Sequence, residues 1–258
     1  MRIRSRSSSF CICAVVSSLL VTAALLPRAH ARSDSVRTLP SAFQRSPYSM
    51  MSLSVGHPNA GWQLRAKKLR RDRRLKIKLG SVGKAYGHPA LVLMLKRSAR
   101  QVARAAPGSV MLIGDLSSRD GGPLSGHTSH QSGRDADVGF YALDARGRRA
   151  VLDRFVAFGA DGRARDGSGL VFDDWRNWLL LQAWAKDHRA GLSHIFVATP
   201  LKQRLLAWAR ARPAFRQYAD AVAALLKQPE NTSPHDDHFH VRIACPKRQK
   251  PICHEESR

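Results

Sequence analysis

Residues 126–139 read G-H-T-S-H-Q-S-G-R-D-A-D-V-G and place two histidines beside two aspartates in one short stretch. A second cluster, H-D-D-H-F-H, follows at residues 235–240. Imidazole nitrogens and carboxylate oxygens are common ligands of divalent metals such as zinc. We therefore expect the two clusters, which hold five of the chain's eleven histidines, to meet around one metal ion.

The spacing within each cluster indicates a loop and strands. His130 and Asp137 are separated by a glycine and short polar residues, which suits a ligand on a loop followed by a ligand on the next strand. This is not the i, i+4 spacing of a helical H-E-x-x-H site. His238 and His240 are two apart, so on a strand both side chains point to the same face. Three protein ligands with an open fourth position are typical of catalytic zinc.

The N-terminal residues 1–31 have the pattern of a cleavable secretory signal peptide. Three arginines precede an uncharged, mostly apolar run over residues 10–26, and residues 29–31 read A-H-A, an A-x-A cleavage pattern. The alternative is an uncleaved membrane anchor, which the short apolar run disfavours. We expect an exported, periplasmic protein without a stable membrane span after cleavage.

The chain is strongly basic, with 43 Lys and Arg against 19 Asp and Glu among 258 residues. Residues 1–31 contain four arginines and no acidic residue, so their removal lowers the net charge from +24 to +20. Such a field favours an anionic partner, namely a cell-wall polymer, an anionic lipid surface or nucleic acid. Export argues against genomic nucleic acid. Residues 65–78 form the densest cationic run, which is either a solvated basic loop or edge strand, or a docking patch for an acidic polymer.

The cysteines agree with export. Cys11 and Cys13 lie in the predicted signal peptide, which leaves Cys245 and Cys253 in the mature chain. In an exported protein such a pair favours a disulfide. Zinc binding by the pair is disfavoured, because nothing nearby completes a four-ligand set.

Hydrophobic periodicity alternates between helical and strand patterns along the chain. It predicts helices over residues 89–105, 173–186, 201–210 and 215–226, and strands over residues 110–114, 136–143, 193–198 and 238–243. Trp175, Trp178 and Trp184 are expected in the core, with sugar or peptide stacking as the alternative. No run of regular βαβ units is present. This predicts an α+β fold in which a small, largely antiparallel sheet carries the metal site and is flanked by helices and long loops.

Other polar residues near the clusters have structural interpretations. We expect Asp135 to brace the turn and to face away from Asp137. Asp236 and Asp237 are expected to support the site from outside or to face solvent. His127, taken alone, is a hydrogen-bonding loop residue, and His88 flanks the start of a helix.

The motifs also resemble a known family. The stretches that carry the resemblance are G-H-T-S-H-Q-S-G-R-D-A-D-V, I-G-D before it, Y-G-H-P, and H-x-x-H-x-H-V-R-I-A-C-P. They resemble the penicillin-insensitive murein endopeptidases, which are zinc peptidases related to lysostaphin-type and D-Ala-D-Ala peptidases. The resemblance covers residues 53–246, the implied zinc peptidase domain, and leaves a C-terminal tail at 247–258. Residues 32–52 are polar, and we expect this segment to be loose.

The resemblance also implies roles for individual residues. One zinc ion would be bound by His130, Asp137 and His240, with His127 as a supporting residue or an additional metal contact. His238 would accept a proton from water or stabilise the oxyanion, and His235 would be the second catalytic histidine.

The implied activity is hydrolysis of peptide crosslinks in peptidoglycan, chiefly the D-alanyl–meso-diaminopimelyl bond, without a serine that β-lactams could acylate. Alternatives are a D,D-carboxypeptidase or dipeptidase of the same group and a catalytically silent wall-binding module. Retention of His235 and His238 argues against the silent module. A metal-dependent nuclease is the remaining alternative, and we expect no nucleic-acid partner.

Overall fold

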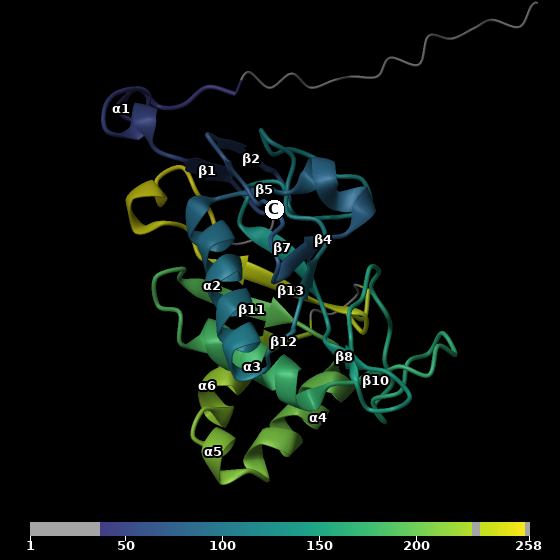
Figure 1. Ribbon diagram of the computed structural model, residues 1–258. Coiled ribbons are helices and arrows are strands. Elements are labelled where there is room, and N and C mark those ends of the chain that lie inside the picture. The colour runs from purple at the N-terminus through teal and green to yellow at the C-terminus, as the bar shows by residue number, and fades with distance from the viewer. Residues whose placement is uncertain (1–36, 229–232, 256–258) are drawn as a thin grey trace, which may run out of the picture. The chain divides into compact units, whose positions relative to one another are not determined.

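A mixed β-sheet carries both histidine clusters. In the computed structural model, which describes residues 37–228 and 233–255, this sheet has six strands in the order β12-β11-β13-β7-β6-β4 (Figure 1). The strands are β4 (Leu75–Ile77), β6 (Met111–Ile113), β7 (Asp135–Gly139), β11 (Leu192–Phe196), β12 (Leu226–Lys227) and β13 (His238–Ile243). The inner pairings β11–β13, β13–β7 and β7–β6 are antiparallel, whereas the outer pairings β12–β11 and β6–β4 are parallel. The predicted α+β fold with a largely antiparallel sheet is therefore confirmed.

The pairing of β13 with β7 sets the positions of the site residues. Its register places His240 opposite Asp137 and Arg242 opposite Asp135. Two residues about a hundred positions apart in the chain thus become neighbours on adjacent strands.

Helices supply most of the remaining core. They are α1 (Ser41–Gln44), α2 (Pro89–Ala105), α3 (Asp174–Ala185), α4 (Thr199–Arg210), α5 (Pro213–Arg216) and α6 (Ala219–Leu225). The bounds of α2 coincide with the prediction, and the His88 imidazole accepts a hydrogen bond from the Ala90 amide at its N-terminus. The Trp184 indole on α3 donates to the Ser98 hydroxyl on α2 and ties the two helices together.

Two predicted elements are divided. The strand predicted over 136–143 is interrupted because the Tyr141 backbone pairs with the side-chain amide of Asn177 instead of a neighbouring strand. The helix predicted over 215–226 is divided into α5 and α6.

Short elements surround the main sheet. The hydrophobic pattern did not predict them, except that Ala142–Leu143 is the end of the strand predicted over 136–143. They are β1 (Leu53–Gly56), β2 (Gly61–Leu64), β3 (Lys67–Lys68), β5 (Tyr86–Gly87), β8 (Ala142–Leu143), β9 (Arg149–Ala150), β10 (Val171–Phe172), η1 (Tyr48–Met50), η2 (Leu79–Lys84) and η3 (Lys247–Gln249). Helix α1 and η1 fall in the segment expected to be loose, where buried Phe43 packs with Leu53 and Ile252. The basic run at 65–78 includes β3 and β4.

The core lies on the face of β13 opposite the histidines. Phe239, between His238 and His240, is fully buried, and its ring packs edge-on against Phe140 and Trp184 at 4.6 and 5.8 Å between centroids. Trp178 and Trp184 are buried as expected, whereas Trp175 is partly exposed.

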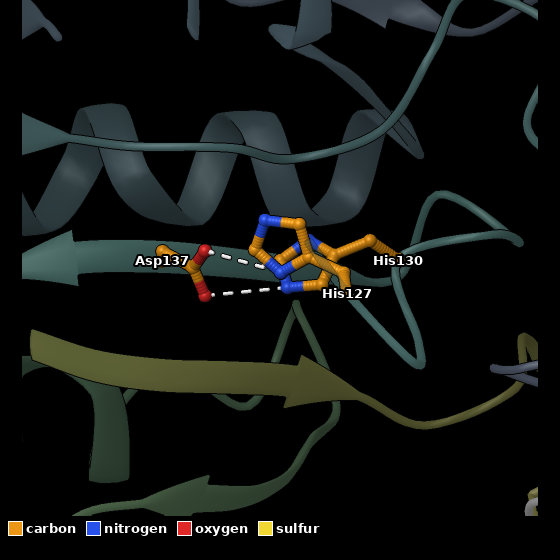
Figure 2. A group of neighbouring side chains, drawn as sticks. All are labelled: His127, His130 and Asp137. Carbon is orange, nitrogen blue, oxygen red and sulfur yellow. Dashed lines mark ion pairs between the residues drawn. The ribbon is translucent and has the colours of Figure 1, made fainter. Parts of the chain in front are cut away.

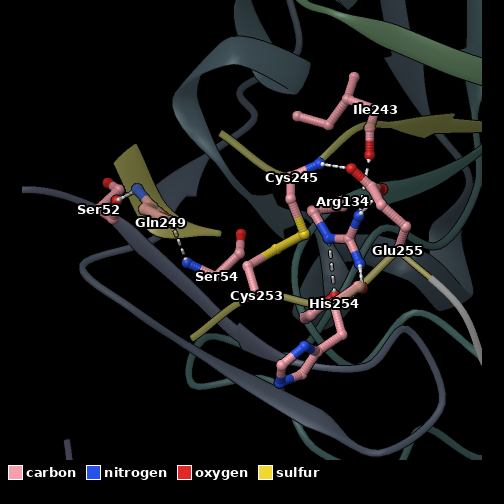
Figure 3. The surroundings of a disulfide bond; sticks show 10 residues. Ser52, Ser54, Arg134, Ile243, Cys245, Gln249, Cys253, His254 and Glu255 are labelled. Atoms are coloured by element: carbon pink, nitrogen blue, oxygen red, sulfur yellow. Dashed lines mark hydrogen bonds and ion pairs between the residues drawn. A yellow bond between two sulfur atoms is a disulfide. The ribbon is translucent and has the colours of Figure 1, made fainter. Parts of the chain in front are cut away.

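The C-terminal residues fold back onto the domain (Figure 3). Cys245 and Cys253 form the predicted disulfide. Within this loop, the side chain of Gln249 donates to the Ser52 carbonyl and accepts from the Ser54 amide, both at 2.8 Å. The buried guanidinium of Arg134 donates to the His254 carbonyl and to the Glu255 carboxylate. Residues 245–255 are thereby fastened beside the start of β7.

None of the helices in residues 37–228 and 233–255 is long and apolar enough to cross a membrane. The predicted signal peptide at 1–31 lies outside the described residues.

Truncating the core side of β13 should destabilise the fold. We expect Phe239→Ala to lower the free energy of unfolding by about 3–5 kcal/mol, because it leaves a cavity between Phe140 and Trp184. Leu79, 88% exposed, provides the control, and Leu79→Ala should change stability by less than about 0.5 kcal/mol. Urea unfolding followed by tryptophan fluorescence measures both, and equal midpoints would contradict the assigned core.

Candidate metal centre

The carboxylate of Asp137 lies at the centre of a group of imidazoles. Its Oδ1 atom is 3.2 Å from His130 Nε2, 3.4 Å from His238 Nε2 and 3.4 Å from His240 Nδ1. Its Oδ2 atom is 3.8 Å from His127 Nδ1. Figure 2 shows the His127 and His130 rings pointing toward this carboxylate from the loop that precedes β7. The two sequence clusters therefore meet in space, and His238 and His240 share one face of β13.

His130 is held in an unusual backbone conformation. Its φ of 67° lies in the left-handed region that non-glycine residues seldom adopt, and such strain is concentrated at functional sites. The Ser117 hydroxyl donates to the His130 carbonyl, and His130 Nδ1 lies 2.5 Å from the Leu116 carbonyl. An imidazole can bond to a carbonyl only by donating, so Nδ1 carries a proton, and in the neutral imidazole Nε2 faces Asp137 with its lone pair.

Gly133 allows the loop to pass close to the β1–β2 hairpin. Its φ is +73°, and a Cβ atom there would lie 1.8 Å from Gln63 Oε1. A larger residue would have to displace the buried Gln63 side chain, and the positive φ would also be strained for it.

Carboxylates outside the cluster orient two of the imidazoles. His240 Nε2 lies 2.9 Å from Asp135 Oδ1, which also accepts from Arg242 Nε. Burial alone would raise the pKa of Asp135, but Arg242 and His240 hold it well below its ordinary value. A charged Asp135 accepts the proton on His240 Nε2, so the Nδ1 lone pair faces Asp137. Such carboxylate–histidine pairs commonly orient metal ligands.

The expectation that Asp135 faces away from Asp137 was wrong. The two residues are two apart on β7, so both side chains point to the same face of the sheet. Asp135 reaches His240 on the neighbouring strand instead of bracing the turn.

His127 has a similar arrangement on the other side of the cluster. Its Nε2 atom is 2.9 Å from Asp115 Oδ2, and the same oxygen accepts from Lys84 Nζ at 3.0 Å. The Nδ1 atom of His127 is then left to face Asp137. His127 is therefore more than a loop residue and is placed to act as an additional ligand.

The residues fit a divalent cation. Asp137 Oδ1 and His130 Nε2 are buried, and neither has a hydrogen-bond partner within the described residues. Buried polar atoms without partners are costly, and electron-rich atoms that converge at such distances repel unless a cation lies among them. One ligand atom from each of His127, His130 and Asp137 lies within 4.8 Å of the others. His240 Nδ1 adjoins this group. The structure therefore brings His127 together with the three predicted ligands His130, Asp137 and His240.

His238 and His235 lie beside the candidate ligands. His238 Nδ1 is 2.5 Å from Asp237 Oδ1, so Asp237 supports the site from outside as expected. Burial by itself would lower the pKa of His238, but the carboxylates of Asp137 and Asp237 raise it to about 9. A divalent cation beside Asp137 would oppose this rise, because it repels the charged imidazole.

His235 is the more weakly basic of the two. Its ring centroid lies 5.4 Å from that of His238 and 5.7 Å from that of His240, and its φ is 52°. Burial, together with the nearby His240 and His238, lowers the pKa of His235 to about 4. It is therefore neutral at pH 7. Its Nδ1 is buried and has no hydrogen-bond partner among the residues described.

Several residues around the site were not singled out from the sequence. Asp115, which orients His127, was visible in the I-G-D motif, whereas the Leu116 carbonyl leaves no signal in a sequence. Phe155, whose ring stacks on His238, lies in a long polar stretch without periodicity. Asp236 pairs with Arg165 at 3.3 Å and not with one of the imidazoles.

A family model described as penicillin-insensitive murein endopeptidase matches residues 55–258. Proteins named penicillin-insensitive murein endopeptidase from Escherichia coli strain 536 and Escherichia coli strain SMS-3-5 are each 33% identical over 174 residues. These alignments cover 62% of this chain and 54% of each relative. The chain thus spans about half the length of the curated relatives it matches.

Removing the charge on Asp135 should weaken metal binding without removing a ligand. We expect Asp135→Asn to lower zinc affinity by about 10- to 100-fold, because the imidazole of His240 loses the carboxylate that orients it. Titration calorimetry on metal-free protein measures this affinity. The matched control is Asp236→Asn, which should bind zinc as the parent protein does. An unchanged affinity in Asp135→Asn, with unfolding midpoints similar to those of the control, would contradict the assigned role.

Proposed function

Because the chain belongs to the family of penicillin-insensitive murein endopeptidases, we propose that it is a zinc-dependent endopeptidase that cleaves peptide crosslinks of peptidoglycan. The bond we assign is the D-alanyl–meso-diaminopimelyl amide. The observation that carries the proposal is the convergence of His130, Asp137 and His240 on one point, with His238 and His235 beside it.

The proposed ligands are His130 through Nε2, Asp137 through its carboxylate and His240 through Nδ1. His127 Nδ1 is a further contact on the exposed side of the site. Two or three imidazoles with one carboxylate favour zinc over magnesium or calcium, which prefer oxygen ligands. A bound zinc ion would supply Lewis-acid chemistry, since it polarises a carbonyl group and lowers the pKa of water.

The protein's own residues would move the protons. His238 is fixed by Asp237 at Nδ1 and by the stacked ring of Phe155, so its Nε2 is aimed at the centre of the site. From there it can accept a proton from the attacking water or donate to the oxyanion of the tetrahedral intermediate. The leaving amine would then receive the proton that His238 took from the water, and His235, which is neutral at pH 7, can relay it.

Charge and location fit this substrate. The predicted mature chain has a net charge of +20, and peptidoglycan peptides carry free carboxylates. We propose that residues 1–31 direct the protein to the periplasm, where this polymer lies. None of the assigned residues is a nucleophilic serine, so β-lactams would have no residue to acylate.

The proposed activity is tested with purified muropeptides. The mature protein should convert crosslinked dimers to monomers, and a chelator should abolish the reaction until zinc is restored. Mass spectrometry identifies the products. Release of D-alanine from monomeric pentapeptide, with dimers left intact, would indicate a carboxypeptidase instead. Degradation of plasmid DNA would indicate a nuclease.

Metal binding and proton transfer should separate by mutation. We expect His238→Ala to retain zinc and to lower kcat on the order of 10²- to 10⁴-fold, because the ligands remain and the proton acceptor is lost. His130→Ala should lose both zinc and activity. Metal content by mass spectrometry and kcat with dimers measure the two effects. Full activity in His130→Ala, or loss of zinc in His238→Ala, would overturn these roles.

A further inference from the structure

The aromatic side chain that stacks on the catalytic histidine also contacts other parts of the site. The Phe155 ring is stacked on His238, with 4.9 Å between centroids and 18° between planes. Two glycines make room for it: a Cβ atom at Gly114 would lie 2.4 Å from the ring, and one at Gly139 would lie 3.1 Å from it. The Cβ position of Gly114 is also 3.2 Å from Asp137 Cβ, so Phe155 forms one wall of the site.

The loop that carries Phe155 is fastened to the second histidine cluster. The Phe158 amide donates to the Asp236 carbonyl at 2.8 Å, and Arg165 pairs with the Asp236 carboxylate at 3.3 Å. Val156 and Phe158 are buried beneath the loop. Phe155 itself is partly exposed, so its position is fixed while part of its surface remains open to a ligand.

A lysine from the basic run reaches the same ring. Lys78 Nζ lies 4.7 Å from the centroid of the Phe155 ring, and the centroid of the His238 ring lies 4.9 Å from the same point. The ammonium and the imidazole therefore both contact one phenyl ring. A cation over an aromatic face is attracted to it but keeps its hydrogen-bond donors.

Lys78 has no acidic partner among the described residues, unlike three other cations of this region. Lys84 pairs with Asp115, Arg165 with Asp236, and Arg154 with Asp166. Within residues 37–228 and 233–255, no carboxylate lies within ion-pair distance of Lys78. An ammonium held beside the reaction centre and lacking a counter-charge is suited to an anionic group of the substrate.

We infer that Lys78 and Phe155 form a subsite for a free carboxylate next to the scissile bond. This inference rests on the proposed function. In a D-alanyl–meso-diaminopimelyl crosslink, the scissile nitrogen is attached to a carbon that also bears a carboxylate. Lys78 binds that carboxylate on the leaving side of the bond, while Phe155 contacts the adjacent methylene chain. The residues thus select crosslinks in which this carboxylate is free over those in which it is amidated.

The test compares two crosslinked dimers, one with this diaminopimelate carboxylate free and one with it amidated. The wild-type protein should cleave the free form with the lower KM. Lys78→Met should raise KM for the free form on the order of ten-fold, with kcat unchanged, and should leave the amidated form unaffected. Lys78→Arg should restore most of the preference.

Lys67→Met is the matched control, because it removes the same charge from an exposed position on β3. It should behave as the wild type if recognition is local rather than an effect of net charge. Equal KM values for both dimers with the wild-type protein, or the same response in both Met variants, would overturn the subsite. Failure of the wild-type protein to cleave either dimer would instead refute the proposed endopeptidase. The comparison of dimers with wild-type protein holds even if Lys78→Met does not fold.

Discussion

A buried carboxylate surrounded by imidazoles is the constraint on which this structure depends. Asp137 is 2% exposed, and nitrogen atoms of His130, His238 and His240 lie 3.2–3.4 Å from one of its oxygens. Without a cation, such a group is costly to bury. Much of the surrounding architecture can be understood as holding these atoms together, from the strained backbone of His130 to the arginines beside Asp135.

Strand β13 shows how one short sequence serves both stability and chemistry. Phe239, Val241 and Ile243 are buried in the core, and the residues between them face the site. His238, His240 and Arg242 therefore approach the site side by side, each with a carboxylate partner. The buried residues anchor the strand and the carboxylates orient the imidazoles, so the candidate site is built on a rigid element.

The sequence patterns predicted those helices and strands whose limits depend on their own residues and near neighbours in the chain. Helix α2 was predicted to the residue, because a proline, a regular apolar face and a Pro-Gly pair mark it. The break at Tyr141 was missed because it depends on Asn177, a partner from a distant element. The orientation of Asp135 could have been deduced from strand alternation, but its contact with His240 required the register of two strands.

The candidate site was predictable to a similar extent. Spacing and family resemblance placed His130, Asp137 and the histidines of β13 in one centre, since residue type and order carry that information. The supporting contacts carry no such signature. A main-chain carbonyl at Leu116 and a phenyl ring at Phe155 are determined by the path of loops, which periodicity does not describe.

The position of β13 in the sheet has a consequence for biosynthesis. This strand occupies the middle of the sheet, between β7 and β11, yet it follows both in the chain. Arg134, next to Asp135, is in turn held by residues 254 and 255. A nascent polypeptide that ends before residue 238 therefore contains His127, His130 and Asp137 but has an unfilled gap between its strands. The candidate metal site therefore stays incomplete until synthesis has passed this strand, because His238 and His240 belong to it.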